Sequence, residues 1–269
     1  MQLIRKGLNY MQANHFYLIE VQYLGFRYHG WQRQPGVKTV QEMIERTLKY
    51  ILADKPFKIL GASRTDAMVS ATQAAFELFL EHPEDLEALM ADFNENLPAD
   101  IRAINIKKVD KKFNVIQHAK EKEYLYLFSF GEKNHPFAAP YITYIREALD
   151  VELMMEGARL FQGVHNFQEY CYKPNEGTQF EREITCSEII ENEIWTANFF
   201  PEQSFVYRVK GMGFMRNQIR LFMGRLFRLG KHEISLSDIQ QSLDNPSDSP
   251  EYYIAPASGL MLHQMKFKK

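Results

Sequence analysis

The chain has 269 residues and an apolar share of 45%, enough for one large domain or two modest ones with a sizeable core. No apolar run approaches the length of a membrane span, and residues 1–15 hold no apolar secretory segment, so a cytoplasmic protein is expected. The net charge of -2 is uninformative by itself, and two cysteines and eight scattered histidines predict neither a disulfide framework nor a metal site.

The first half of the chain predicts the element order β-α-β-β-α-β, a split βαβ unit. Residues 15–25 form a strand rich in aromatic and β-branched residues, and a polar loop follows over residues 26–38. A helix starts at Thr39, because Thr39 and Glu42 have the spacing of a capping box and apolar residues then recur on one face. The remaining elements are strands at 56–61 and 72–80, a helix opened by Pro83, and a strand at 101–109.

The second half repeats this order less regularly. Its strands are expected at 120–130, 184–190, 205–210 and 260–267, and its helices at 151–161 and 214–229. Insertions fall around 136–140, 170–180 and 235–256. We therefore predict two α+β halves of related topology, divided near residues 109–119, with a cleft between them.

Basic residues are concentrated in two segments that contain no acidic residue. Residues 205–232 hold Arg208, Lys210, Arg216, Arg220, Arg225, Arg228 and Lys231, and residues 21–40 hold Arg27, Arg33 and Lys38. The rest of the chain then has 22 basic residues against 34 acidic ones. This segregation predicts a positive surface that suits a polyanion such as a nucleic acid, and the alternative is a solvated basic helix face.

The segment Ser63-Arg64-Thr65-Asp66-Ala67 lies between two predicted strands. A short link between strands is a place where a rigid scaffold presents a reactive side chain. A carboxylate two residues from an arginine can be held ionised and aimed outward. Asp66 is therefore a candidate nucleophile.

The polar loop over residues 28–36 contains groups that suit RNA. Arg33 can reach a phosphate, Trp31 and Tyr28 can stack on bases, and Gln32 offers an amide edge. The alternative is a surface loop with Trp31 tucked into the core.

Two further segments offer chemistry. Alternation along the strand at 120–130 places Tyr124 and Tyr126 on one face, where Tyr124 could stack on a base, handle a proton or simply pack. In the basic helix, Arg216 and Arg220 share a face, and Arg220 lies beside an apolar stripe. A partly buried arginine needs an anionic partner, and Asp66 is a plausible one. Gly224, one turn further, would let another backbone come close.

Taken in chain order, these segments resemble the tRNA pseudouridine synthase A family. The resemblance is carried by Tyr28-His29-Gly30-Trp31-Gln32-Arg33-Gln34-Pro35 with Thr39-Val40-Gln41, Arg64-Thr65-Asp66-Ala67, Lys122-Glu123-Tyr124-Leu125-Tyr126, Gly163-Val164-His165-Asn166-Phe167, Phe214-Met215 with Gln218-Ile219-Arg220, and Ala255-Pro256-Ala257-Ser258-Gly259-Leu260. Single motifs of this kind are weak, whereas six in order at plausible spacings are specific.

The resemblance implies two ferredoxin-like (βαββαβ) halves, residues 1–112 and 113–269, with antiparallel sheets flanking a central positively charged cleft. It implies a homodimer that isomerises uridine to pseudouridine in the anticodon stem-loop of tRNA, at tRNA positions 38–40, without metal or organic cofactor. Asp66 would be the nucleophile, Tyr124 would stack on the target uracil or act as an acid or base toward it, and Arg220 would pair with Asp66. The RNA-binding residues would be Arg27, Trp31, Gln32, Arg33, Lys38, Arg64, Arg216, Asn217 and Arg225.

Two regions depart from the family pattern: the Asp66 loop, and the end of the first strand, where Leu24 precedes Gly25 and the family often has aspartate. Ser63 and Met68 stand where the family usually has glycine. If the second position needs a positive φ, Met68 is strained there. Two other readings of the chain remain: a non-catalytic or altered-specificity tRNA-binding paralogue, and an aspartate-based hydrolase of a small nucleoside, which would leave the basic helix without a role.

Overall fold

The computed structural model describes residues 13–247, 250 and 252–268. The chain divides into two compact units: unit 1 extends to Lys120 and resumes at Gln264, and unit 2 covers Glu121–His263. The predicted division after residue 112 lies slightly earlier, and it assigned the whole final strand to the second half. The final strand, β10 (Leu260–Phe267), instead begins in unit 2 and ends in unit 1. The boundary therefore crosses the chain twice, once near residue 120 and again within β10.

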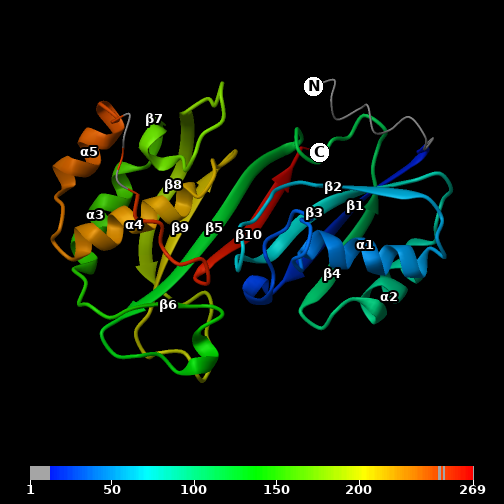
Figure 1. Ribbon diagram of the computed structural model, residues 1–269, viewed down its shortest axis with the longest axis horizontal. Helices are drawn as coiled ribbons and strands as arrows, with labels where there is room; N and C mark the ends of the chain where they lie inside the picture. The colour runs from blue at the N-terminus through cyan, green and yellow to red at the C-terminus, as the bar shows by residue number, and fades with distance from the viewer. Residues whose placement is uncertain (1–12, 248–249, 251, 269) are drawn as a thin grey trace. The chain divides into compact units, whose positions relative to one another are not determined.

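Unit 1 has the predicted order of two helices and four strands (Figure 1). These are β1 (His15–Tyr23), α1 (Val40–Ile51), β2 (Phe57–Gly61), β3 (Ser70–Leu80), α2 (Leu86–Asn96) and β4 (Ile101–Lys108), with a 3-10 turn at Gly25–Arg27. The strands lie in the order β4-β1-β3-β2 and all three pairings are antiparallel. Helix α1 packs against α2 and β2, and α2 packs against β4.

Helix caps set where the helices of unit 1 begin. Thr39 is the N-cap of α1, as predicted, and its side-chain oxygen accepts a hydrogen bond from the Glu42 amide at 3.3 Å. Helix α2 begins at Leu86 and not at Pro83, because the Asp85 carboxylate caps it by accepting from the Ala88 amide at 2.9 Å.

Unit 2 holds three helices and most of the remaining strands (Figure 1). They are β5 (Ala119–Phe130), which starts in unit 1, β6 (Thr143–Ile145), α3 (Val151–Leu160), β7 (Gly163–Asn166), β8 (Glu181–Glu191), β9 (Phe205–Gly211), α4 (Gln218–Gly230) and α5 (Leu236–Asp244). Strands β5, β9, β8 and β7 pair in that order and antiparallel, while β6 runs parallel to β5. Helix α3 packs against α4, α5 and β8.

Two expectations for unit 2 are corrected. The basic helix begins at Gln218 and not at residue 214, because Asn217 has a left-handed backbone (φ 58°) that interrupts helical geometry. Helix α5 lies inside a segment expected to be an insertion, and a capping box between Ser235 and Asp238 starts it.

The α+β class with mostly antiparallel pairing is confirmed. The described residues contain no helix with the length and apolar character needed to cross a bilayer. The expectation for residues 1–15 concerns positions that lie almost entirely outside the described residues.

Candidate functional site

Asp66 lies in the short connection between the paired strands β2 and β3, as predicted. The residue is half-buried, with exposed Arg64 and buried Thr65 just before it. The Thr65 hydroxyl shares a hydrogen bond of 2.9 Å with the Tyr23 hydroxyl, which fixes the base of the connection to strand β1. A rigid mounting of this kind suits a side chain that must approach a substrate in one orientation.

A second loop, residues 24–38, holds the Asp66 connection in place. The Trp31 amide donates to the Thr65 carbonyl at 3.1 Å, and the Met68 amide donates to the Tyr28 carbonyl at 3.0 Å. Gly30 permits this contact, because a Cβ there would lie 2.5 Å from the Thr65 carbonyl oxygen and its φ is +87°. The two loops therefore form one hydrogen-bonded assembly around Asp66.

Met68 sits in a strained backbone conformation next to Asp66. Its φ is 67°, and the Val69 amide donates to the Asp66 carbonyl at 3.2 Å, so residues 66–69 form a turn with a positive φ at its third position. Such a position favours glycine. Ser63, the other departure from the family pattern in this loop, has no positive φ. Glycine is therefore conformationally favoured at residue 68 and not at residue 63.

Met68→Gly is expected to raise the free energy of unfolding by about 0.5–1 kcal/mol, because relief of left-handed strain exceeds the entropic cost of glycine. Urea unfolding would measure the change. Ala67→Gly is the matched control, because Ala67 has no positive φ and should lose about the same amount. A lower stability of Met68→Gly would contradict the assigned strain.

The ring of Trp31 is buried, which corrects its prediction as an RNA-stacking residue. Its side chain is 2% exposed and packs against Gly61, Tyr23 and Phe76. The alternative reading, a core tryptophan under a polar loop, is the one the structure supports. Tyr28 is also 2% exposed, and its hydroxyl donates to the Asp100 carboxylate at 2.5 Å, so it packs in the loop together with Trp31.

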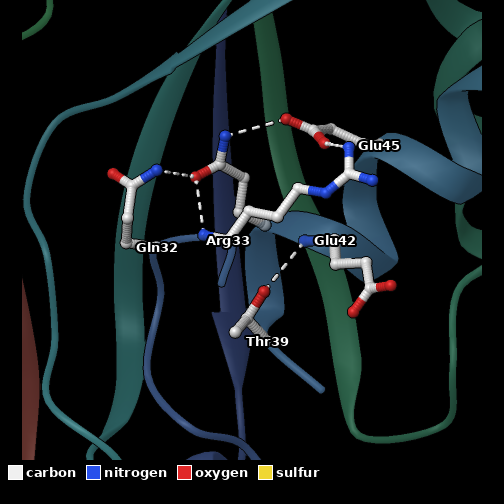
Figure 2. A network of polar contacts seen from close by, with 6 residues as sticks. Gln32, Arg33, Thr39, Glu42 and Glu45 are labelled. Carbon is white, nitrogen blue, oxygen red and sulfur yellow. Dashed lines mark hydrogen bonds and ion pairs between the residues drawn. The ribbon is translucent and has the colours of Figure 1, made fainter. Parts of the chain in front are cut away.

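Polar contacts order the outer part of the same loop (Figure 2). Arg33 forms an ion pair of 3.0 Å with Glu45, and the Gln41 side chain accepts from the Gln32 side chain and from the Arg33 amide. Arg33 remains 63% exposed, so its guanidinium can still meet a phosphate.

Two further predicted RNA-binding residues of this loop also have partners. Arg27 pairs with Asp100 and remains 63% exposed, and the Lys38 ammonium lies 4.9 Å from the centre of the Tyr28 ring. Burial opposes ionisation of Asp100, but hydrogen bonds from Tyr28 and Arg27 prevail and lower its pKa.

Tyr124 lies on β5 opposite Val209 of β9 and is 6% exposed. Its ring meets the Phe214 ring edge to face, with centroids 5.2 Å apart. Tyr126 points to the same side of the strand, toward Phe227 of α4, as alternation predicted. Tyr124 therefore lies beside the residues that lead into α4.

Arg220 is held by the turn before β10. Its Nε donates to the Ala255 carbonyl at 2.7 Å, and the Ala255 amide donates to the Arg220 carbonyl at 3.1 Å. A Cβ at Gly224 would overlap the Tyr253 carbonyl oxygen, which confirms the predicted close approach of a second backbone. The turn at residues 255–260 therefore helps to orient Arg220.

Most charges of the basic run are already paired within unit 2. Carboxylates accompany Arg208 (Glu123 and Glu188), Lys210 (Glu123), Arg225 (Glu169), Arg228 (Glu233) and Lys231 (Glu147). Arg225, predicted to bind RNA, is 20% exposed and 3.2 Å from Glu169, which argues against that role. The run therefore supplies less positive surface than its sequence suggests.

Two predicted RNA-binding residues precede α4 and differ in their contacts. Arg216 is exposed, and its guanidinium carbon lies 5.6 Å from the centre of the Tyr172 ring. The Asn217 side chain accepts from Arg220 at 3.5 Å, a long hydrogen bond. Tyr172 was not predicted as a contact of Arg216, because Tyr172 lies in a predicted insertion. An aromatic residue next to a basic one, as in Tyr172-Lys173, is nevertheless a pattern that suits nucleic-acid binding.

The candidate catalytic residues come from both units, Asp66 from unit 1 and Tyr124 and Arg220 from unit 2. An ion pair between Asp66 and Arg220 stays a prediction. Among the described residues, no group of histidine, cysteine, aspartate or glutamate side chains could hold a metal ion.

Comparison with known proteins gives a consistent result. A family model described as tRNA pseudouridine synthase matches residues 19–116 and 158–268. The tRNA pseudouridine synthase A of Dictyoglomus thermophilum is 31% identical over 251 residues, which cover 93% of this chain and 98% of that protein. The tRNA pseudouridine synthase A 2 of Bacillus cereus is 30% identical, covering 94% of this chain and 100% of that protein.

A solved structure titled "Crystal Structure of a Cbf5-Nop10-Gar1 Complex" matches 77% of this chain and 46% of that chain, with 16% identity and a TM-score of only 0.32. The matched family ranges include Asp66 and Arg220, and Tyr124 lies between them. The family match covers well over half of the sequence, and the relatives align with it almost end to end. The chain belongs to the tRNA pseudouridine synthase family.

Proposed function

We propose that this protein isomerises uridine to pseudouridine in the anticodon stem-loop of tRNA, at positions 38–40, and that Asp66 is the nucleophile. The observation that carries the proposal is the rigid position of the loop that bears Asp66. Asp66 stands on a connection between paired strands that a second loop fixes through backbone hydrogen bonds. This arrangement presents one carboxylate in a defined direction, and the chain's family supplies the reaction.

The reaction breaks the bond between N1 of uracil and C1′ of ribose, turns the base and joins its C5 to C1′. The C5 proton is lost and N1 gains a proton, so the change is an isomerisation. A carboxylate can attack either the sugar or the base, or stabilise charge as the glycosidic bond breaks. No water molecule needs to be activated, so the proposed mechanism uses neither a metal nor an organic cofactor. The target base must leave its stack first, which is easier in a loop than inside a duplex.

Arg220 and Tyr124 have supporting roles in this proposal. Arg220 pairs with the Asp66 carboxylate and orients it, and its own position is fixed by the Ala255 carbonyl and the Asn217 side chain. Tyr124 stacks on the target uracil or exchanges a proton with it, from a place on β5 where Phe214 limits its movement.

The proposal extends to the architecture and the assembly. The order β4-β1-β3-β2 of unit 1, with one helix after β1 and another after β3, fits a ferredoxin-like half. In unit 2 the sequence β5, α3, β8, β9, α4, β10 fits a second half with insertions. We propose a positively charged cleft between the halves, a homodimer and a cytoplasmic location, as the family resemblance implies.

Incubation of the purified protein with unmodified tRNA, followed by chemical mapping of pseudouridine, tests this proposal. New pseudouridine is expected in the anticodon stem-loop alone. Modification elsewhere would contradict the proposed target. A protein that binds tRNA and forms no pseudouridine would instead support the non-catalytic paralogue.

A further inference from the structure

An exposed arginine lies over a tyrosine ring just before α4. The Arg216 guanidinium carbon lies 5.6 Å from the centre of the Tyr172 ring, and the Lys173 ammonium lies 5.2 Å from the same ring. The Tyr252 ring meets Tyr172 edge to face, with centroids 5.5 Å apart. Arg216 and Lys173 are exposed and Tyr172 is half-buried, so two solvent-accessible cations lie against one aromatic ring.

Backbone contacts hold this arrangement in place. The Tyr172 amide donates to the Arg216 carbonyl at 3.1 Å, which joins the two segments directly. The Met215 amide donates to the buried Gln218 side chain at 2.8 Å, and the Tyr252 hydroxyl donates to the Cys171 carbonyl at 3.0 Å. The surface is thus pre-organised, which lowers the entropic cost of binding a planar group.

The chain also ties this surface to Tyr124. Phe214 contacts the Tyr124 ring, and Arg216 follows only two residues later. Two residues of extended chain span at most about 7 Å. A nucleotide next to one bound at Tyr124 therefore falls within reach of Arg216.

We propose that Arg216 and Tyr172 form a stacking subsite for an unpaired nucleobase that flanks the target uridine. The base lies on the outer face of the Arg216 guanidinium, which Tyr172 supports, and Lys173 faces the adjoining phosphate. Unpaired bases are commonly recognised by stacking on arginine planes, whereas a lysine offers only a point charge. The inference rests on the proposed function, because it takes the uridine-binding position from Tyr124.

Binding of a fluorescent anticodon stem-loop to wild-type and Arg216→Lys protein at constant salt tests the subsite. The substitution keeps the charge and removes the plane, so the dissociation constant is expected to rise about tenfold, within the range for loss of one stacking contact. The same pair is then measured with stem-loops that each lack one flanking base. The stem-loop that lacks the base stacked on Arg216 should bind wild-type and Arg216→Lys protein with equal affinity.

Three further variants separate stacking from structural damage. Tyr172→Ala should weaken binding of the intact RNA and spare the abasic RNA, whereas Tyr172→Phe keeps the ring and should stay within about twofold of wild type. Arg46→Lys is the matched control, because it makes the same exchange at an exposed arginine of α1.

Equal weakening of every RNA by Arg216→Lys would overturn the proposal, since it would mean a phosphate contact or a structural role. An unchanged dissociation constant would overturn it as well. Failure of the proposed function can be told apart from failure of the subsite. In that case wild-type protein would form no pseudouridine in tRNA, whatever the binding measurements show.

Discussion

Asp66→Ala protein is expected to bind tRNA and to form no detectable pseudouridine. Removal of a covalent nucleophile typically costs on the order of 10⁴-fold or more in turnover. Affinity should change little, because phosphate contacts dominate the binding of nucleic acids and Asp66 contributes no positive charge. The backbone hydrogen bonds that shape the connection do not use the Asp66 side chain, so the loop should survive the substitution. Single-turnover mapping of pseudouridine and a gel-shift titration measure the two quantities.

Asp66→Asn gives a stricter version of the same experiment. The amide has nearly the shape of the carboxylate and cannot act as the nucleophile, so it should be as inactive as alanine. Asp92→Ala, which removes an exposed carboxylate from α2, is the matched control and should keep full activity. If Asp66→Ala protein still forms pseudouridine, Asp66 is not the nucleophile, although the family assignment would stand.

Local sequence patterns predicted the elements that depend on local physics. The capped start of α1 at Thr39 and the connection that carries Asp66 follow from nearby residues, and both lie where expected. The burial of Trp31 and the ion pair of Arg225 escaped prediction because their partners are distant in sequence. The core neighbour Phe76 covers the Trp31 ring, and Glu169 neutralises Arg225. These contacts join residues far apart in the chain, so a short sequence segment cannot reveal them.

The left-handed backbone positions show a related limit. Asn217 delays the start of α4 from the expected residue 214 to Gln218, and Met68 occupies a turn position that favours glycine. Asparagine adopts the left-handed conformation more readily than most residues. At Met68, by contrast, the surrounding structure overrides the residue's own preference, which is common beside functional sites. The departure of Met68 from the family pattern was visible in the sequence, but only the backbone shows that the position has a positive φ.

Glu77→Gln is expected to stabilise the protein at pH 8 by about 3 kcal/mol relative to wild type and to have little effect at pH 4.5. Glu77 lies on β3 with 1% of its surface exposed. One carboxyl oxygen accepts from the Val115 amide at 3.2 Å, and the other has no hydrogen-bond partner among the described residues. Burial therefore raises the pKa of Glu77 from 4.5 to about 7.

The direction of the pH dependence follows from this raised pKa. The folded state holds the Glu77 proton more tightly than the unfolded state does. Protonated Glu77 therefore contributes fully to the free energy of unfolding below pH 4.5, and this contribution is lost as the pH rises to about 7. Glutamine cannot ionise, so the stability difference between variant and wild type should grow over that interval and then level off. Its amide can still accept the hydrogen bond from Val115.

Urea unfolding at pH 4.5, 6, 7 and 8 measures this difference in a Trp195→Phe background. The sequence has two tryptophans, so Trp31 then reports alone, and its ring packs on Phe76, the residue before Glu77. Glu87→Gln, at an exposed site on α2, should show no pH-dependent gain. A difference that stays flat across the four pH values would mean that Glu77 ionises normally in the folded protein, and that water or another group solvates its second oxygen.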